Sequence, residues 1–212
     1  MQFDINKILK RKDGNMELLI VVDMVNGFIK KGNMADKYIN HIINPNIELI
    51  KKINKEGGNI VFIKDTHKIK SREFDRFPVH CLEESEESKV IDELKEYEKV
   101  AFTKNSTSAM YAKGFKEYID NLKNLKKIIL SGCCTDICVM NLALDLQNYF
   151  DENNKNIDII VPKDVVETYS GPNHNREEYN EIAFKIMNNA GIKLVKTWRN
   201  IWIKQWWQTY MS

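Results

Sequence analysis

Short apolar runs alternate along the chain with segments whose apolar residues recur at helical spacing. The run at 18–22 (Leu-Leu-Ile-Val-Val) has no polar position, which is typical of a strand buried on both faces. From such runs we expect six strands, over residues 18–22, 59–64, 99–103, 127–130, 158–161 and 192–195. Helical spacing, with stops such as Gly57-Gly58, predicts helices over residues 42–55, 90–94, 115–122, 138–150 and 176–190.

Strands that are separated by helices build βαβ units, in which the strands run parallel. We therefore expect an α/β protein with an open, mostly parallel six-stranded sheet and helices on both faces, as in Rossmann-like folds. A chain of 212 residues fits one domain, and it has neither an internal repeat nor a linker-like stretch. We expect a single domain over 1–212, with a core at about 17–195 and an extension at 196–212.

Charged residues make up 29% of the chain and the net charge is +2, with both signs interspersed. This balance gives no basic patch, so we do not expect a nucleic-acid partner. Residues 1–17 contain no apolar signal segment and the chain has no run of 18 apolar residues, so we expect no membrane partner. Three of the four cysteines fall in one turn, unlike a secreted disulfide framework, which favours a reducing cytoplasm.

Charged and thiol-bearing residues follow the last apolar residue of four predicted strands: Asp23, Asp65, Lys104 and the turn at 133–138. The carboxyl ends of parallel strands form the ligand crevice of an open sheet, so these groups can be neighbours. Charged residues also end strands simply because the chain meets water there. Four groups of complementary chemistry favour a site over that alternative.

Cys133, Cys134 and Cys138 crowd a predicted strand-to-helix turn, with Cys138 at the first turn of the helix. The positive end of the helix dipole lowers the pKa of a thiol, and free backbone N–H groups there can hold an oxyanion. We predict that Cys138 is a nucleophile and that Cys133 is a core residue. The Cys134-x3-Cys138 spacing also loosely fits metal ligands, but no second cysteine pair completes a structural zinc site.

A thiol nucleophile needs a base and a supporting charge, which Asp23 and Lys104 can supply. Three segments together resemble the isochorismatase-like cysteine hydrolases, and among them the nicotinamidases. They are Val-Asp-Met-Val-Asn-Gly-Phe at 22–28, Lys104 with Tyr111 seven residues later, and Gly-Cys-Cys-Thr-Asp-Ile-Cys-Val at 132–139.

The resemblance implies a catalytic triad of Asp23, Lys104 and Cys138. In it Asp23 accepts the thiol proton and later delivers it to the leaving amine, while Lys104 holds the carboxylate and favours the thiolate. The resemblance also implies a cis peptide between Cys133 and Cys134. The backbone N–H groups of Cys134 and Cys138 then form the oxyanion hole.

A second group of polar residues follows the strand predicted at 59–64. Asp65 and His67 alternate at the strand end and can converge on one ion, and His80 follows the loop-stiffening Pro78. Carboxylate and imidazole ligands suit Zn²⁺, Mn²⁺ or Fe²⁺ better than Ca²⁺ or Cu⁺. The resemblance to nicotinamidases implies one divalent ion, first of all Zn²⁺. Its implied ligands are Asp65, His67, Glu73 and His80, with Asp75 competing for the place of Glu73.

The same resemblance implies aromatic pocket walls from Phe28, Phe77 and Tyr111, with Ile137 beside the nucleophile. Flat apolar walls suit a pyridine ring. The implied reaction is hydrolysis of the small-molecule amide nicotinamide to nicotinic acid and ammonia in NAD salvage. It would run through a cysteine thioester while a metal orients the ring. The alternatives are hydrolysis of another small amide, such as a carbamoyl or ureido compound, and a non-enzymatic thiol or binding module.

All four tryptophans lie within residues 198–207, and Trp198, Trp202 and Trp206 are spaced by four. Such a stripe predicts a C-terminal helix that packs on its own domain or on a second subunit. The second possibility agrees with the homo-oligomer that we expect. Binding to a membrane surface is the alternative, but the segment has few basic residues.

Overall fold

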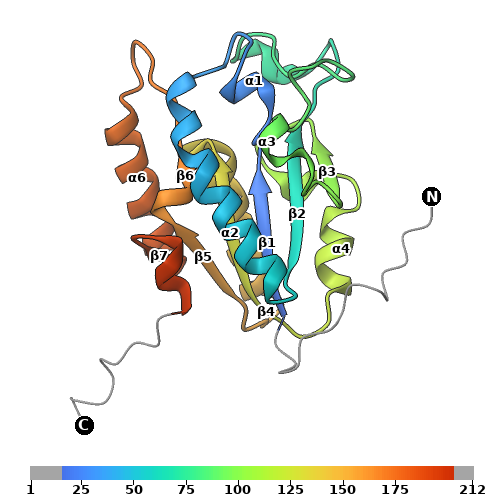
Figure 1. Cartoon of the computed structure of the whole chain (residues 1–212), viewed down its shortest axis with the longest axis vertical. Helices are drawn as coiled ribbons and strands as arrows, with labels where there is room; N and C mark the ends of the chain where they lie inside the picture. Colours follow the sequence, from blue (N-terminus) through green and yellow to red (C-terminus); the bar gives the residue numbers. More distant parts are fainter. Residues whose placement is uncertain (1–15, 203–212) are drawn as a thin grey trace.

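The computed structural model describes residues 16–202, in which a seven-stranded sheet forms the centre (Figure 1). The strand order is β3-β2-β1-β4-β5-β7, with β6 beside β4, and all of the pairs are parallel. The strands are β1 (Met16–Val22), β2 (Asn59–Asp65), β3 (Ala101–Lys104), β4 (Leu125–Cys133), β5 (Asp158–Pro162), β6 (Val166–Glu167) and β7 (Lys193–Val195).

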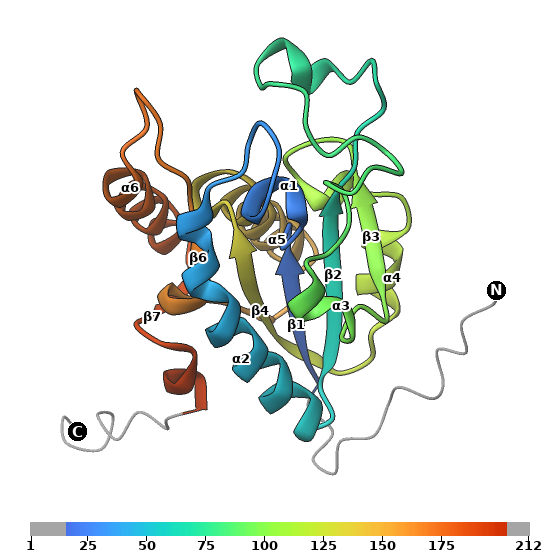
Figure 2. The same cartoon turned by 45° about the horizontal axis from the view of Figure 1, so that its top comes forward.

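Helices cover both faces of the sheet, with α2 on one face and α4, α5 and α6 on the other (Figures 1 and 2). The helices are α1 (Asn26–Ile29), α2 (Ile43–Lys55), α3 (Asp92–Lys95), α4 (Phe115–Asn121), α5 (Met140–Glu152) and α6 (Arg176–Asn189). Shorter helical turns are Lys37–Ile42, Arg72–Asp75, Ala109–Tyr111, Thr135–Val139, Lys163–Val165 and Trp198–Trp202. No helix within 16–202 combines the length and apolar character that crossing a membrane requires.

The predicted parallel α/β fold is confirmed, with seven strands in place of six. The additional strand, β6, has only two residues, too few to leave a hydrophobic pattern in the sequence. The helix predicted from residue 138 begins instead at Met140, because Thr135–Val139 form a separate π-helical turn. The central position of β1 explains its apolar run, since residues 18–22 are completely buried between β2 and β4.

The described part of the C-terminal segment packs on the domain. Trp198 is 9% exposed and joins the core on the α2 side, and the indole N–H of Trp202 donates to Glu17 at 3.1 Å. Trp206, Trp207 and Tyr210 lie outside the described residues, so the predicted stripe is seen only in its first two members.

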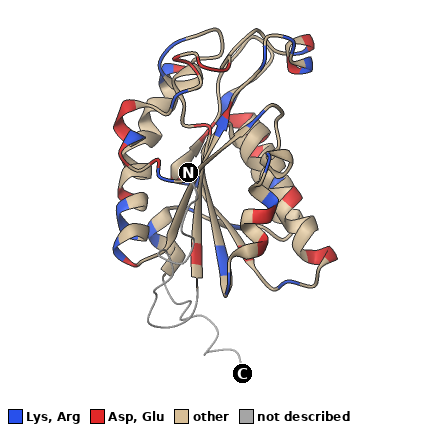
Figure 3. Ribbon diagram, turned by 90° about the vertical axis from the view of Figure 1, so that its right-hand side faces the viewer, with Lys and Arg blue, Asp and Glu red and all other residues tan. Residues whose placement is uncertain are grey.

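Charged residues of both signs lie along the helices and loops on either side of the sheet (Figure 3). A few charged groups instead lie at the carboxyl edge, where strands of different sequence position end together. Asp65 and Lys104 are register partners in β2 and β3, and Asp23 follows β1 directly. Figure 2 turns this edge forward and shows the chain between β2 and β3 arching over it.

Gly132 allows β1 and β4 to approach closely at this edge. Its φ is +105°, and a Cβ at this position would lie 1.9 Å from the carbonyl oxygen of Val22. The turn that carries the cysteines therefore depends on a residue without a side chain.

We expect Gly132→Ala to lower the free energy of unfolding by at least about 3 kcal/mol, because it adds backbone strain and a clash with backbone. Gly171→Ala is the matched control, since its Cβ would meet the nearest atom, on the Tyr169 ring, at 3.4 Å. Denaturant unfolding of both variants measures the difference. Similar stabilities would show that this contact does not constrain the fold.

Candidate active site

A buried lysine connects the groups that follow the strands. The Nζ atom of Lys104 lies 2.9 Å from Asp23 Oδ2 and 2.8 Å from Asp65 Oδ1, and it donates to Cys138 Sγ at 3.5 Å. All four residues are buried, with exposed fractions between 0 and 7%. Strand ends from β1, β2 and β3 and the turn after β4 thus bring together the three predicted triad residues.

Asp23 is suited to accept a proton. Burial raises the pKa of its carboxyl to about 6, although Lys104 opposes the shift. Its Oδ2 atom forms an ion pair with Lys104, and its contacts with Lys104 and with Cys138 both lower the pKa. Burial alone would lower the pKa of Lys104, but Asp23 and Asp65 raise it well above its usual range. The lysine therefore stays an ammonium ion.

The pKa of the Cys138 thiol differs from the lowered value that we expected from its place near the start of a helix. Burial raises the pKa of this thiol well above its usual range; Lys104 opposes the shift, and the carboxylates of Asp23 and Asp65 add to it. The expectation of a lowered pKa is therefore wrong for the resting thiol. Because the thiolate is not the resting form, its proton must go to a neighbouring base when the sulfur reacts.

The turn that carries Cys138 has the backbone form that the resemblance implied, since the peptide between Cys133 and Cys134 is cis. Cys133 is completely buried and its Sγ donates to the carbonyl oxygen of Asp23 at 3.1 Å. This places Cys133 in the core, beside the site and outside its cavity. All four cysteines are free thiols, which leaves Cys138 available as a nucleophile.

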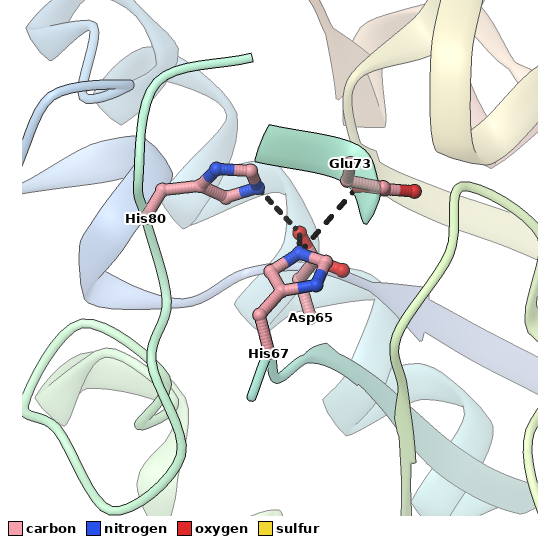
Figure 4. A group of neighbouring side chains, drawn as sticks. All are labelled: Asp65, His67, Glu73 and His80. Atoms are coloured by element: carbon pink, nitrogen blue, oxygen red, sulfur yellow. Dashed lines mark hydrogen bonds and ion pairs between the residues drawn. The ribbon is translucent and has the colours of Figure 1, made fainter. Parts of the chain in front are cut away.

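The second predicted group also converges in space (Figure 4). Asp65, His67, Glu73 and His80 are buried, and each has a ligand-type atom within 4.8 Å of those of the others. Asp65 Oδ2 lies 2.9 Å from Nε2 of His67 and 3.0 Å from Nε2 of His80. Asp75, the competing third ligand, is exposed and lies outside this group.

Hydrogen bonds behind the two histidines orient their rings. Nδ1 of His67 lies 3.0 Å from the side-chain oxygen of Asn105, and Nδ1 of His80 lies 2.7 Å from the carbonyl oxygen of Pro78. Carbonyl-type oxygens accept, so each Nδ1 carries a hydrogen, and each Nε2 is the ring nitrogen that can bind an ion once it carries no proton. Asn105 was not identified from the sequence, although it follows Lys104 directly.

The donor set fits a divalent transition ion. Two carboxylates and two imidazoles are ligands for Zn²⁺, Mn²⁺ or Fe²⁺. In addition, Glu73 Oε1 is buried without a hydrogen-bond partner among residues 16–202, as expected of an atom that binds an ion.

A narrow cavity of about 20 Å³ joins the two groups. Its lining contains three of the four predicted pocket residues, Cys138 of the triad and three members of the metal-type group: Phe28, Met34, Asp65, Glu73, Phe77, His80, Thr107, Cys134, Ile137 and Cys138. Met34 and Thr107 were missed, because neither belongs to a periodic pattern or to a motif.

Tyr111 does not form a wall of this cavity. Its side chain is 79% exposed and it is absent from the lining. The short helix Ala109–Tyr111 buries Ala109 and leaves Tyr111 in solvent. The prediction of three aromatic walls is thus corrected to two, from Phe28 and Phe77.

Comparisons with known proteins agree with this architecture. The family model for the isochorismatase domain matches residues 17–197. Nicotinamidase 1 of Arabidopsis thaliana is 32% identical over 152 residues, which cover 62% of this chain and 61% of that protein. The aligned region thus spans less than two thirds of that relative.

Two solved structures share the fold. The pyrazinamidase of Pyrococcus horikoshii, solved in complex with zinc, is 26% identical with a TM-score of 0.68, covering 84% of this chain and 98% of that chain. N-carbamoylsarcosine amidase from Thermoplasma acidophilum is 24% identical with a TM-score of 0.69, covering 84% of this chain and 95% of that chain. The family match over nearly all of the described residues confirms the resemblance, and the chain belongs to the isochorismatase family of hydrolases.

Proposed function

We propose that this protein hydrolyses nicotinamide to nicotinic acid and ammonia, a reaction of NAD salvage. One observation carries the proposal: the cavity that contains Cys138 is also lined by Asp65, Glu73 and His80 of the metal-type group. A metal beside the nucleophile is useful for a substrate that has both a carboxamide and a ring nitrogen. The similarity to a nicotinamidase and to a zinc-containing pyrazinamidase supports this choice.

In the first half of the reaction, the thiol proton of Cys138 moves to Asp23 and the sulfur attacks the carboxamide carbon. The carbonyl electron pair moves to oxygen, where the backbone N–H groups of Cys134 and Cys138 stabilise the negative charge. When the carbonyl re-forms, the C–N bond breaks and Asp23 returns its proton to the departing ammonia. A thioester on Cys138 remains.

In the second half, water attacks the thioester carbon while Asp23 accepts a proton from it. The C–S bond then breaks, nicotinic acid leaves and Cys138 regains its proton. Lys104 keeps its positive charge throughout, and its contacts with Asp23 and Cys138 hold base and nucleophile together.

The remaining cavity residues act on the ring. Phe28 and Phe77 provide flat walls for an aromatic heterocycle. A divalent ion, in our proposal Zn²⁺, held by Asp65, His67, Glu73 and His80 would supply a Lewis acid with open positions for a ring nitrogen.

Ammonia release from nicotinamide, pyrazinamide and small carbamoyl amides tests the proposal. We expect metal-loaded protein to act on the two ring amides and to prefer them over carbamoyl compounds. Turnover of carbamoyl amides alone would favour the alternative, hydrolysis of a small amide that has no ring for a metal to orient. Absence of turnover with all three classes would favour a thiol or binding module.

The proposed role of Asp23 predicts a pH dependence. Asp23 must be ionised to accept the thiol proton, and its pKa is about 6. We therefore expect kcat/KM for nicotinamide to be constant above this pH and to fall about tenfold per unit below it. Profiles of kcat/KM against pH at two concentrations of free metal distinguish this acidic fall from loss of metal, which occurs when the histidine ligands become protonated. An acidic fall that moves with metal concentration, or no fall down to pH 5, would contradict the role of Asp23.

A further inference from the structure

A second buried pair of charged groups, His174 and Asp136, lies outside the cavity and has no part in the steps above. Nε2 of His174 lies 2.8 Å from Asp136 Oδ2, and both side chains are 10% exposed. Asp136 lies in the turn Thr135–Val139, two residues before Cys138, and His174 precedes α6 in the chain. The pair therefore ties the start of α6 to the turn that carries the nucleophile.

Both ring nitrogens of His174 face hydrogen-bond acceptors. Nδ1 lies 2.9 Å from the carbonyl oxygen of Tyr169, and Nε2 faces the carboxylate of Asp136. A carbonyl oxygen and an ionised carboxylate only accept hydrogen bonds, so with Asp136 ionised both ring nitrogens donate. A ring that donates from both nitrogens is an imidazolium ion, and its bond to Asp136 is charge-assisted.

The surroundings fix this ring in one orientation. Tyr169 stacks on it with centroids 4.0 Å apart and planes 6° apart, and Tyr179 covers it at 3.8 Å. The backbone of His174 is also held, because its N–H and C=O bond with Gly171. A rigid donor in this position can define where Asp136 lies.

Asp136 in turn belongs to a tightly bonded piece of backbone. The carbonyl oxygen of Cys134 accepts from the N–H groups of Ile137 and Val139, both at 3.1 Å. A displaced Asp136 would move this turn, together with Cys138 and the two N–H groups that we assign to the oxyanion hole. Errors of about 1 Å in such groups can reduce a rate about 100-fold.

We propose that His174 is a positioning residue, whose imidazolium form holds Asp136 and thereby keeps the nucleophile turn in its reactive geometry. The proposal rests on the proposed amide hydrolysis at Cys138. It predicts that His174→Ala and Asp136→Ala each lower kcat about 10- to 100-fold and leave KM within about twofold. The double variant should lose no more than either single variant, since both remove the same contact.

Asp136→Asn is the conservative variant. An asparagine amide can donate to Nε2 of a neutral ring whose Nδ1 still donates to Tyr169, so the geometry survives without the charge. We expect this variant to retain most of the wild-type kcat. His41→Gln is the control, because the side chain of His41 is 49% exposed and lies outside the cavity.

Two measurements on the same variants need no substrate. Long-range ¹H–¹⁵N spectra should show both nitrogens of His174 protonated in the wild type, and only Nδ1 protonated in Asp136→Asn. Alkylation of Cys138 by iodoacetamide, located by peptide mass mapping, should slow in the two alanine variants in proportion to kcat. If the wild type does not hydrolyse nicotinamide, the proposed function fails, whereas the spectra and alkylation rates still test the pairing.

Three results would overturn the proposal. The first is a neutral His174 ring in the wild type, and the second is a wild-type kcat and alkylation rate in His174→Ala. The third is a double variant in which the fold-loss in kcat equals the product of the fold-losses in His174→Ala and Asp136→Ala. The second result, if it came with a lower melting temperature, would give the pair a purely structural role.

Discussion

Replacing Cys138 with alanine should lower amide hydrolysis at least about 10⁴-fold, because it removes the only atom that forms the thioester. The change deletes one sulfur atom from a residue that is 7% exposed, so the fold should survive. The measurement is the initial rate of ammonia release per folded enzyme, with the melting temperature of each sample recorded beside it.

Cys133→Ser is the matched control for this variant. Cys133 lies in the same turn and is completely buried, but its sulfur donates to the Asp23 carbonyl oxygen and does not line the cavity. A serine hydroxyl can make the same hydrogen bond, so we expect activity within about tenfold of the wild type. Equal losses in the two variants would mean that the cysteines of this turn act on structure and not on chemistry.

Removing the proposed metal ion should abolish turnover and leave the fold intact. The two hydrophobic cores lie on the faces of the sheet, whereas the metal-type group lies at its edge, so the ion is not needed for packing. We expect chelator-treated protein to lose more than about 100-fold in rate, to keep its circular dichroism spectrum and to recover when Zn²⁺ or Mn²⁺ is added back. His67→Ala should bind Zn²⁺ or Mn²⁺ with a higher Kd than the wild type.

Asp75→Ala controls for the change of charge near this group, because Asp75 is exposed and lies outside it. We expect this variant to bind metal and to turn over like the wild type. Binding by the wild type should weaken as the pH falls through the histidine range, since imidazole must lose its proton to bind an ion. A wild type that is fully active without bound metal would refute the site.

The parts of this architecture that could be predicted are those marked in the sequence by a run or periodic pattern of apolar residues, or by several motifs together. Fully apolar runs such as 18–22 identify central strands, and polar residues directly after them, such as Asp23 and Asp65, identify the edge where a site forms. β6 was missed because two residues carry no periodicity. Tyr111 was misplaced because a motif fixes sequence position, whereas a short helical turn decides which side chain faces the cavity.

Long-range pairing sets the other limit on prediction. His174 and Asp136 are 38 residues apart, and nothing in either neighbourhood identifies the other as its partner. Asn105 likewise gains its role only when β2 and β3 bring it beside His67. The pKa of Cys138 was predicted in the wrong direction because a helix position can be read from the sequence, whereas burial beside two carboxylates cannot.

The central claim is that Cys138 carries the acyl group of a nicotinamide substrate. The most direct measurement mixes metal-loaded enzyme with nicotinamide, quenches it in acid during the first turnover and maps the peptides by mass spectrometry. We predict a nicotinoyl group on the peptide that contains Cys138, and no such group in Cys138→Ala. Release of ammonia without any acyl group on Cys138, or with the group on another residue, would contradict the claim.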